Sequence, residues 1–237
     1  MKRPIEAWKY LLVATEQAQA NLENVNVFLD LLMLASSNEV HLEALKQHHD
    51  WPSFKGRMEL VTAPYLLRVA DEICIYQDQI PRALHGTHIA PHALEVAARF
   101  SVLTRLEPPD VEMYHPEVQR LVADLTPTEK MRLYDDGTVP ERLSQKERRE
   151  LRQIAPDLAD EYDSRDDYEG RYGASAREIR AVLLNAAQNK RFDHLSPIAV
   201  IEELRNLVRS KSSYEWALPR TPPGRRSREA GLAEDAR

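Results

Sequence analysis

Arg177 is the residue whose type and position point most directly to chemistry. It lies in Gly173-Ala174-Ser175-Ala176-Arg177-Glu178, where Ser175 and Glu178 form a capping box that starts a helix. Arg177 therefore falls in the first helical turn, where the helix dipole disfavours a cation by up to about 1 kcal/mol. An arginine in this place indicates either a site for an external anion or an ordinary surface residue in a solvated turn.

A second candidate site follows the most apolar stretch of the chain. Residues from Val25 to Leu34 are nearly all apolar, and the run stops at Ala35-Ser36-Ser37-Asn38-Glu39. An apolar run of strand length that is closed by polar residues predicts a strand buried on both faces. In open α/β sheets ligands bind at the carboxyl ends of such strands, so these polar residues either line a ligand site or form a solvated turn after a core strand.

Two other groups of polar residues have spacings that imitate functional sites. Asp71-Glu72 follows an apolar run, as magnesium-binding acidic pairs do, but helical periodicity continues through it and favours a charged helix face. His85, His88 and His92 have spacings that suit a metal on a helix, but Gly86 and Pro91 interrupt a helix there, which favours loop histidines.

Composition and missing motifs exclude several classes of function. The net charge of -6, with acidic and basic residues interspersed, argues against nucleic acid as the main partner. The 237 residues contain no apolar segment of membrane-spanning length, and the single cysteine, Cys74, fits a core position in a reducing cytoplasm. Neither a Gly-x-x-x-x-Gly-Lys-Ser/Thr phosphate loop nor the His-Arg-Asp, Asp-Phe-Gly and Ala-Pro-Glu signatures of protein kinases occur in the sequence.

The elements that must position these residues change in character at Pro64. Before it we expect a helix over Met1–Glu23, the apolar strand, a helix over Glu39–His48 and a second strand over Met58–Ala63. After it, helical spacing predicts helices over Leu66–Ile80, ended by Pro81, and over Ala93–Leu106.

Helix starts in the second half are marked by capping residues. Thr126 with Glu129, Ser144 with Glu147, and Ser175 with Glu178 are capping boxes, and Ser196-Pro197 begins the last helix. Asp157–Arg171 is strongly charged and predicts a solvated connector, and residues 219–237 have the composition of a disordered tail.

Several segments together resemble the PrkA-type serine protein kinases, whose N-terminal module is an AAA+ ATPase domain. The resemblance runs in order from about Lys2 to Trp216 and is carried by Lys2-Arg3-Pro4-Ile5-Glu6-Ala7, Leu29–Glu39, Phe54-Lys55-Gly56-Arg57-Met58-Glu59-Leu60-Val61, Pro64-Tyr65-Leu66-Leu67-Arg68 with Asp71-Glu72, and Gly173–Arg177. It implies a mainly α fold with a small β portion (α/β), in which a partial AAA+ P-loop NTPase core precedes a helical lid. Residues 1–65 then form the C-terminal part of the αβα core, 66–218 the lid, and 219–237 a Pro/Arg-rich tail.

The resemblance also implies roles for individual residues. Asn38 matches the sensor 1 position, where a polar side chain orients the attacking water beside the γ-phosphate. Arg57 resembles the arginine finger that reaches the nucleotide of a neighbouring subunit, and Arg68 competes with it for this role. Arg177 matches sensor 2, an arginine of the lid that senses the γ-phosphate, which would account for a cation at a helix start.

The chain departs from the family pattern at both ends. The family's Walker A and Walker B motifs lie upstream of the matched residues, and its kinase-associated C-terminal domain follows the Tyr214-Glu215-Trp216 region, so we expect this chain to lack all three. The implied family role is ATP-dependent protein-serine phosphorylation in bacterial signalling, with ATP and Mg as cofactors, other AAA+ subunits in a ring as partners and protein substrates. No nucleotide is expected to bind this chain alone.

Two other functions remain open at this stage. One is a non-catalytic module that acts on complete PrkA-type subunits by lending Arg57 in trans. The other is a plain helical regulatory domain without any nucleotide. Neither alternative involves nucleic acid or a membrane, and all three functions place the protein in the cytoplasm.

Overall fold

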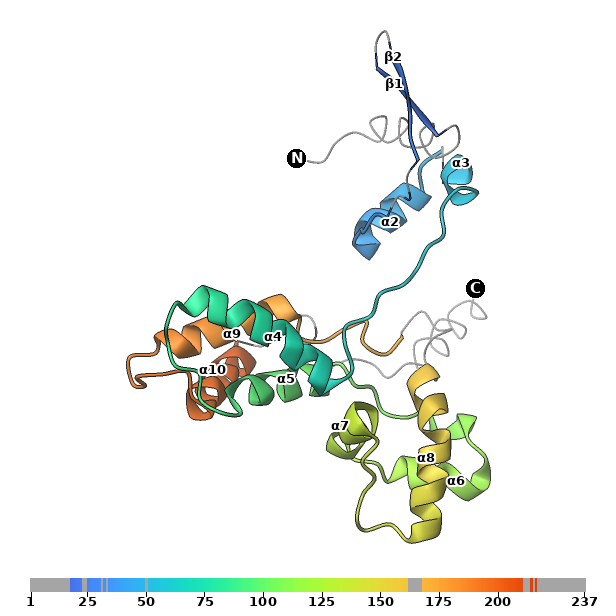
Figure 1. Ribbon diagram of the computed structural model, residues 1–237. Helices are drawn as coiled ribbons and strands as arrows, with labels where there is room; N and C mark the ends of the chain where they lie inside the picture. The colour runs from blue at the N-terminus through green and yellow to red at the C-terminus, as the bar shows by residue number, and fades with distance from the viewer. Residues whose placement is uncertain are drawn as a thin grey trace, which may run out of the picture. The chain divides into compact units, whose positions relative to one another are not determined.

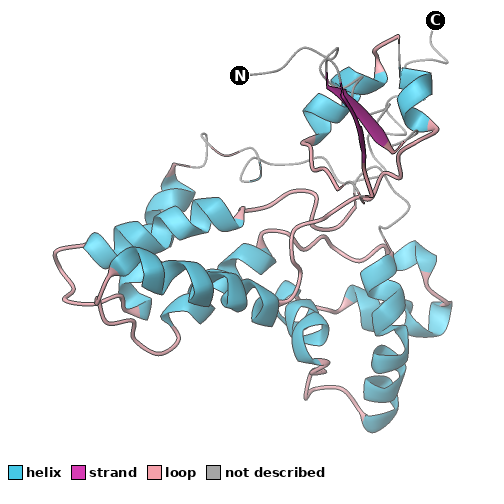
Figure 2. Ribbon diagram, turned by 45° about the horizontal axis from the view of Figure 1, so that its top comes forward, coloured by secondary structure: helices cyan, strands magenta, loops and turns pink. Residues whose placement is uncertain are grey.

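The chain divides into two structural units, Met1–Ala63 and Pro64–Arg237. A computed structural model describes residues 18–22, 25–30, 32, 34–49, 51–161, 168–210, 214 and 216 (Figure 1). Helices dominate these residues, and the strands among them are confined to one hairpin in the N-terminal unit (Figure 2). The predicted mainly α character is therefore confirmed.

The described residues of the N-terminal unit form a hairpin and two short helices. Strands β1 (Gln19–Leu22) and β2 (Val25–Phe28) pair antiparallel, with Gln19 opposite Phe28 and Leu22 opposite Val25. Helix α2 (Glu39–Lys46) confirms the predicted helix, and α3 (Trp51–Lys55) follows it. The helix predicted over Met1–Glu23 lies mostly outside the described residues, and its last part is the strand β1 instead.

The predicted strand buried on both faces is wrong. Among the described residues of this run, only the first part, β2, is a strand, and Phe28 in it is 77% exposed. Leu32 and Leu34 lie beyond β2 in loop conformation and are also exposed. A buried strand needs neighbours on both edges and layers on both faces, whereas a two-stranded hairpin supplies one edge. The second strand, predicted over Met58–Ala63, is wrong too, because this segment is irregular and exposed.

Four helices of the C-terminal unit pack around one apolar core. They are α4 (Val69–Leu84), α5 (Ala93–Leu103), α9 (Ala176–Gln188) and α10 (Pro197–Arg209), and each contacts at least two of the others (Figure 1). The buried side chains of this core include Tyr76, Ile80, Ala97, Val102, Ile179, Leu183, Val200 and Leu204. The helices adjacent in sequence thus form two helical hairpins, α4–α5 and α9–α10, and the two hairpins pack against each other.

A second, smaller cluster lies in the segment between α5 and α9. The short 3-10 helix η1 (Val111–Met113) precedes α6 (Pro116–Ala123), α7 (Pro127–Asp136) and α8 (Gln145–Asp160). The buried residues of this second cluster are Leu121, Val122, Leu125, Leu133, Val139, Leu151 and Leu158.

Among the described residues, no helix of either unit combines the length and the apolar character that crossing a lipid bilayer requires.

The capping predictions are confirmed at every position. The capping boxes of Thr126, Ser144 and Ser175 are complete, since each hydroxyl accepts from the backbone N–H three residues on and each glutamate accepts from the backbone N–H of the capping residue. Ser196 caps α10 by accepting from the N–H of Ala199 at 3.2 Å.

Helix α4 corrects two predictions. It continues through Pro81 to Leu84. Proline in the last turn removes a single backbone hydrogen bond, while Ile80 and Leu84 still pack on the core. Cys74 is exposed rather than buried, because the buried face of α4 runs through Val69, Glu72, Tyr76 and Ile80.

The solvated connector predicted over Asp157–Arg171 is wrong at both ends. Helix α8 runs to Asp160, and the two glutamates on either side of residues 162–167, which lie outside the described residues, are only 4% exposed. Glu169 accepts from Lys130 Nζ at 2.7 Å and from Tyr134 at 3.0 Å, and Glu161 accepts from Tyr114 at 2.8 Å. Buried carboxylates require such partners, and the sequence does not show that they exist.

Candidate functional site

The start of α9 presents Arg177 to solvent. Ser175 Oγ accepts from the N–H of Glu178 at 3.2 Å, and Glu178 Oε2 accepts in return from the N–H of Ser175 at 2.6 Å. This reciprocal cap fixes the first turn, from which the exposed Arg177 projects. No hydrogen bond or ion pair joins Arg177 to another of the described residues, so its guanidinium is available to an external anion.

Aromatic residues from the end of the described chain pack against the same turn. Trp216 Nε1 donates to Glu178 Oε1 at 3.4 Å, and the indole contacts the ring of Phe100 edge-on at a centroid distance of 6.2 Å. Tyr214 lies 5.7 Å from the same indole. Both carboxylate oxygens of Glu178 are therefore used, one for the helix cap and one for Trp216.

Behind this turn lies a fully buried ion pair. Arg105, which follows α5, and Glu72 of α4 are each 1% exposed and bind in a bidentate manner, with N–O distances of 2.8 and 2.9 Å. Arg105 also donates to the carbonyl of Ala174, one residue before the helix cap, at 2.7 and 3.0 Å. Tyr76 donates to Glu72 at 2.6 Å, and burial and this hydrogen bond raise the pKa of Tyr76.

The other predicted site residues are also exposed. Asn38 precedes α2 as its N-cap residue but makes no side-chain capping bond, and Arg57 follows α3 and donates to the carbonyl of Ser53. Both belong to the N-terminal unit. Arg68 belongs to the C-terminal unit, where it lies 3.8 Å from Asp71 and donates to the carbonyl of Asp135 at 3.2 Å. The sensor 1 and arginine-finger roles of these residues stay predictions.

Comparison with known proteins assigns the chain to a family. A family model described as "PrkA AAA domain" matches residues 1–113, and one described as "PrkA serine protein kinase C-terminal domain" matches residues 128–223. The chain belongs to the PrkA family. Since residues 128–223 match the C-terminal domain, our expectation that the chain lacks this domain is wrong.

Two curated PrkA relatives carry different functional names. The ATP-dependent protease PrkA of Bacillus subtilis (strain 168) is 34% identical over 111 residues, which are 46% of this chain and 16% of the relative. The serine/threonine kinase YeaG of Escherichia coli (strain K12) is 33% identical over 112 residues, which are 46% of this chain and 17% of the relative. The aligned part is thus a small fraction of each relative, and no solved structure matches the chain.

The boundary between the two PrkA family models cuts through a single packed core. Helices α4 and α5 fall in the AAA match, whereas α9 and α10 fall in the C-terminal match. All four contribute to the same buried cluster, and α4 contacts α9 as α5 contacts α10. In this PrkA-family chain the two sequence domains are therefore structurally inseparable at this point.

Sequence reasoning missed Glu72 and Arg105, although a signal for each was present. Glu72 was assigned to a charged helix face, yet it lies on the stripe Val69, Glu72, Tyr76, which has helical spacing and is buried. Arg105 continues the buried stripe of Ala98 and Val102 at the same spacing. A charged residue in register with a buried stripe is the pattern that indicates a buried pair.

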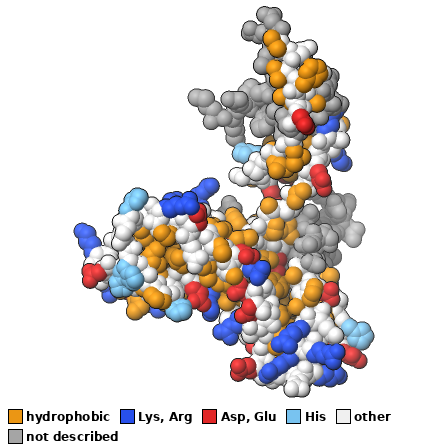
Figure 3. All heavy atoms as spheres, viewed as in Figure 1, with side chains coloured by type: hydrophobic (Ala, Val, Ile, Leu, Met, Phe, Trp, Pro, Cys, Tyr) orange, Lys and Arg blue, Asp and Glu red, His pale blue; other side chains and the backbone are white. Residues whose placement is uncertain are grey.

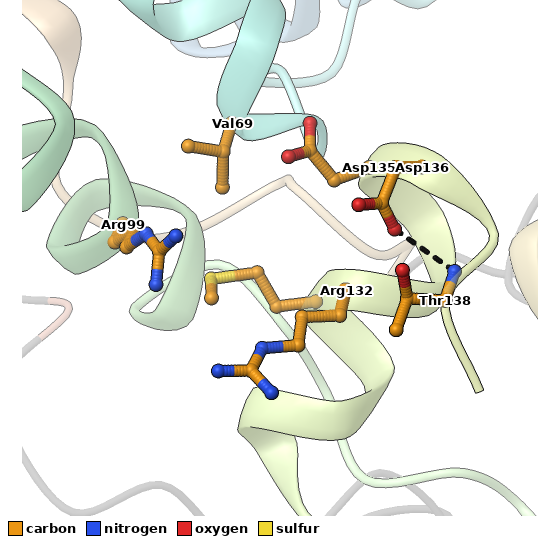
Figure 4. Close-up of a pocket in the computed structure, with 7 residues that line it drawn as sticks. Val69, Arg99, Arg132, Asp135, Asp136 and Thr138 are labelled. Atoms are coloured by element: carbon orange, nitrogen blue, oxygen red, sulfur yellow. Dashed lines mark hydrogen bonds between the residues drawn. The ribbon is translucent and has the colours of Figure 1, made fainter. Parts of the chain in front are cut away.

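A cavity of about 290 Å³ lies beside α4, α5 and α7 (Figure 4). The side chains that line it include the cations Arg99 and Arg132 and the carboxylates Asp135 and Asp136. Asp135 accepts from the N–H of Ala70, and Asp136 accepts from the N–H of Thr138. Hydrogen bonding from the Thr138 side chain, and then from its backbone N–H, lowers the pKa of Asp136. Because the opposite charges offset each other, the cavity offers no clear preference for a phosphate.

The histidines considered as metal ligands do not form a metal centre. His92 binds Glu95 at 2.6 Å, an interaction that lowers the pKa of Glu95, and His88 lies 5.7 Å from the ring of His194. Within the part of the chain that the structure describes, no three His, Cys, Asp or Glu side chains are placed to hold a metal ion.

Proposed function

We propose that this chain is the sensor and lid portion of a PrkA-type AAA+ protein, and that Arg177 contacts the γ-phosphate of a bound ATP. The observation that carries the proposal is the exposed guanidinium of Arg177 in the capped first turn of α9. A γ-phosphate placed there would meet both the arginine and the positive end of the helix dipole, and the two would act in the same direction. The repulsion between Arg177 and the helix end would then be relieved by the nucleotide.

The four-helix core of α4, α5, α9 and α10 is the part that we assign to the lid. In the same proposal the N-terminal unit is the last part of the αβα core, with Asn38 as sensor 1 and Arg57 as the arginine finger. The phosphate loop and the magnesium ligands would come from other PrkA-family sequence, because the 237 residues contain no phosphate-loop motif. ATP and Mg are thus cofactors of the assembly, formed with other AAA+ subunits in a ring.

At the level of the whole protein we propose ATP-dependent phosphorylation of protein serines in bacterial signalling. The name of the matched C-terminal domain and the name of the Escherichia coli relative support this role. The Bacillus subtilis relative is named a protease, but that name too includes ATP dependence. Use of ATP is therefore the element that the two names share.

The test is an ATPase titration with and without a complete PrkA-family protein. The chain alone is expected to show neither micromolar ATP binding by calorimetry nor hydrolysis, because phosphate cradling and magnesium ligation need residues of the partner. In an equimolar mixture the chain should change the partner's ATPase rate. Arg177→Ala should remove most of that change, while Arg205→Ala, which removes an exposed arginine of α10, should keep it.

A second candidate is a non-catalytic module that lends Arg57 to the nucleotide of a complete subunit. It is favoured by the exposed apolar surface of the N-terminal unit, which suits association. The same mixture separates the two candidates. If Arg57→Ala abolishes the rate change and leaves association intact while Arg177→Ala has no effect, the second candidate replaces the first.

A further inference from the structure

We propose that Arg105 is a positioning residue, which together with Glu72 and Thr104 fixes the start of α9 and so holds Arg177 where it meets the nucleotide. This inference rests on the proposed function of Arg177. It assigns a role to a cluster whose ion pair, Arg105 with Glu72, is buried and whose third member, Thr104, is half-buried. We refer to Glu72, Thr104 and Arg105 with their contacts to Gly173-Ala174 as the α9 clamp.

Every hydrogen-bonding group of the central ion pair is used within the protein. The guanidinium of Arg105 makes five hydrogen bonds, two to Glu72, two to the carbonyl of Ala174 and one to the carbonyl of Leu66 at 2.8 Å. Five is the number of N–H donors that an arginine has. The pair therefore has no donor left for a ligand, and its contribution to any site is to hold backbone in place.

The clamp binds both backbone polar groups of Ala174, the residue that precedes the helix cap. Arg105 holds the carbonyl of Ala174, and Thr104 Oγ1 accepts from the N–H of the same residue at 2.8 Å. Ala174 is followed directly by the cap residue Ser175, and Arg177 lies two residues further. The orientation of the first turn of α9 is thus set by the two residues that follow α5, through three direct hydrogen bonds.

Gly173 shows how closely the two segments approach. Its φ of +130° is a conformation that side chains rarely adopt, and a Cβ there would overlap Arg105 Cγ and lie 3.0 Å from the carbonyl oxygen of Thr104. The glycine before Ala174 is therefore required by the clamp, in addition to any role in the turn itself.

The clamp also joins the two parts of the chain that match different family models. Glu72, Thr104 and Arg105 lie in the AAA match, whereas Gly173 and Ala174 lie in the C-terminal match. A displacement of α4 or α5 would reach Arg177 through the clamp, because a buried ion pair must stay paired when its surroundings move. The clamp is thus the direct polar connection between the AAA part and the arginine proposed to sense nucleotide.

The test uses Thr104→Val, which removes the hydrogen bond from the N–H of Ala174 and the hydroxyl's own hydrogen bond to the carbonyl of Ser101, and leaves the buried charges paired. Thr104→Ser keeps the hydroxyl and is the conservative control, and Arg99→Lys is a control on the exposed face of α5. Circular dichroism and the thermal midpoint establish that each variant is folded. Hydrogen exchange of a peptide covering residues 173–180 then reports the start of α9.

We expect Thr104→Val to speed exchange at Ala174 and Ser175 about five- to tenfold, as loss of the hydrogen bond from the N–H of Ala174 implies, with wild-type exchange elsewhere in α9. In the mixture with a complete PrkA-family protein it should reduce the change in ATPase rate, mainly through the KM for ATP. Thr104→Ser and Arg99→Lys should behave as wild type. Added to Arg177→Ala, Thr104→Val should produce no further change in rate.

The outcomes separate the two proposals. If Arg177→Ala removes the rate change and folded Thr104→Val does not alter it, the clamp has no positioning role and the proposed function stands. Unchanged exchange at Ala174 and Ser175 in folded Thr104→Val overturns the inference as well. If Arg177→Ala behaves as wild type, the proposed function fails and the positioning role fails with it.

Discussion

At the scale of single residues, the polar groups that matter most in the C-terminal unit are buried ones. Arg105 and Glu72 form one pair, and Lys130 and Glu169, whose side chains are each 2% exposed and whose charged atoms lie 2.7 Å apart, form another. Each pair has a tyrosine bound to its carboxylate, Tyr76 on Glu72 and Tyr134 on Glu169. Neutral phenols donate to both carboxylates, so the protonated form of each tyrosine is part of the folded structure.

The two tyrosines predict a loss of stability at high pH. Burial raises the pKa of Tyr134, and the charge of Glu169 raises it further, while in the unfolded chain tyrosine ionises near pH 10. Above about pH 10 the unfolded state therefore holds fewer protons than the folded state, and the free energy of unfolding falls as pH rises. Urea unfolding between pH 8 and pH 11 measures this slope.

The variant Tyr134→Phe isolates the contribution of Tyr134 to this alkaline fall in the free energy of unfolding. It should lower stability at neutral pH by the loss of its hydrogen bonds, and it should make the alkaline fall shallower. Tyr65→Phe, which changes a more exposed ring, should keep the wild-type slope. An equally steep fall in Tyr134→Phe would show that other groups cause the alkaline destabilisation.

At the scale of elements, the sequence correctly predicted features that depend on residues close together in the chain, such as helix starts. The capping boxes of Thr126, Ser144 and Ser175 depend on residues three apart, and the structure contains all three. The burial predicted for the strand that contains Phe28 was wrong, because strand burial depends on neighbours far away in sequence. Glu169 was assigned to a solvated connector for a similar reason, since its partner Lys130 lies 39 residues earlier.

Breaking the buried ion pair of Lys130 and Glu169 should strongly lower the free energy of unfolding of the C-terminal unit. Glu169→Gln leaves a buried ammonium without its counter-charge and should cost about 3–5 kcal/mol of unfolding free energy. Glu150→Gln is the matched control, because Glu150 pairs with Lys146 at 3.6 Å on the surface and should contribute less than about 1 kcal/mol. Urea unfolding monitored by circular dichroism compares them.

A double replacement tests the reason for this difference. Lys130→Met combined with Glu169→Leu removes both charges and should recover much of the stability lost in Glu169→Gln, because neither charge is left buried alone. A double variant less stable than Glu169→Gln would contradict this reason. It would show that the hydrogen bonds from Tyr134 to Glu169 and from Lys130 to the carbonyl of Glu107 contribute more to stability than the pairing of the two charges does.

At the scale of the whole molecule, the two units differ in how they treat their apolar residues. The C-terminal unit buries apolar side chains in two cores and exposes a few, such as Ile198 and Val208, whereas no described side chain of the N-terminal unit is buried (Figure 3). The exposed residues there include Val25, Phe28, Leu32, Leu34, Val40, Leu60 and Val61. Burying one such side chain is worth roughly 1.5–3 kcal/mol, so leaving several exposed forgoes a stabilisation comparable with that of a whole domain, about 5–15 kcal/mol.

This contrast predicts that the two units exchange backbone hydrogens at very different rates. In the isolated chain, amides of β2 (Val25–Phe28) should exchange within the fastest class, because a lone hairpin is marginally stable in water. Amides in the middle of α9, around Val182 and Leu183, should exchange slowly, since this helix is buried in the four-helix core. Addition of a complete PrkA-family protein should slow exchange in β2 and leave α9 nearly unchanged, because the apolar surface would then be covered.

Phe28→Ser, which removes the largest exposed side chain of β2, should weaken this protection and reduce aggregation without altering exchange in α9. Slow exchange through β2 in a monodisperse monomer would contradict the prediction, since it would show that the N-terminal unit is stable without a partner.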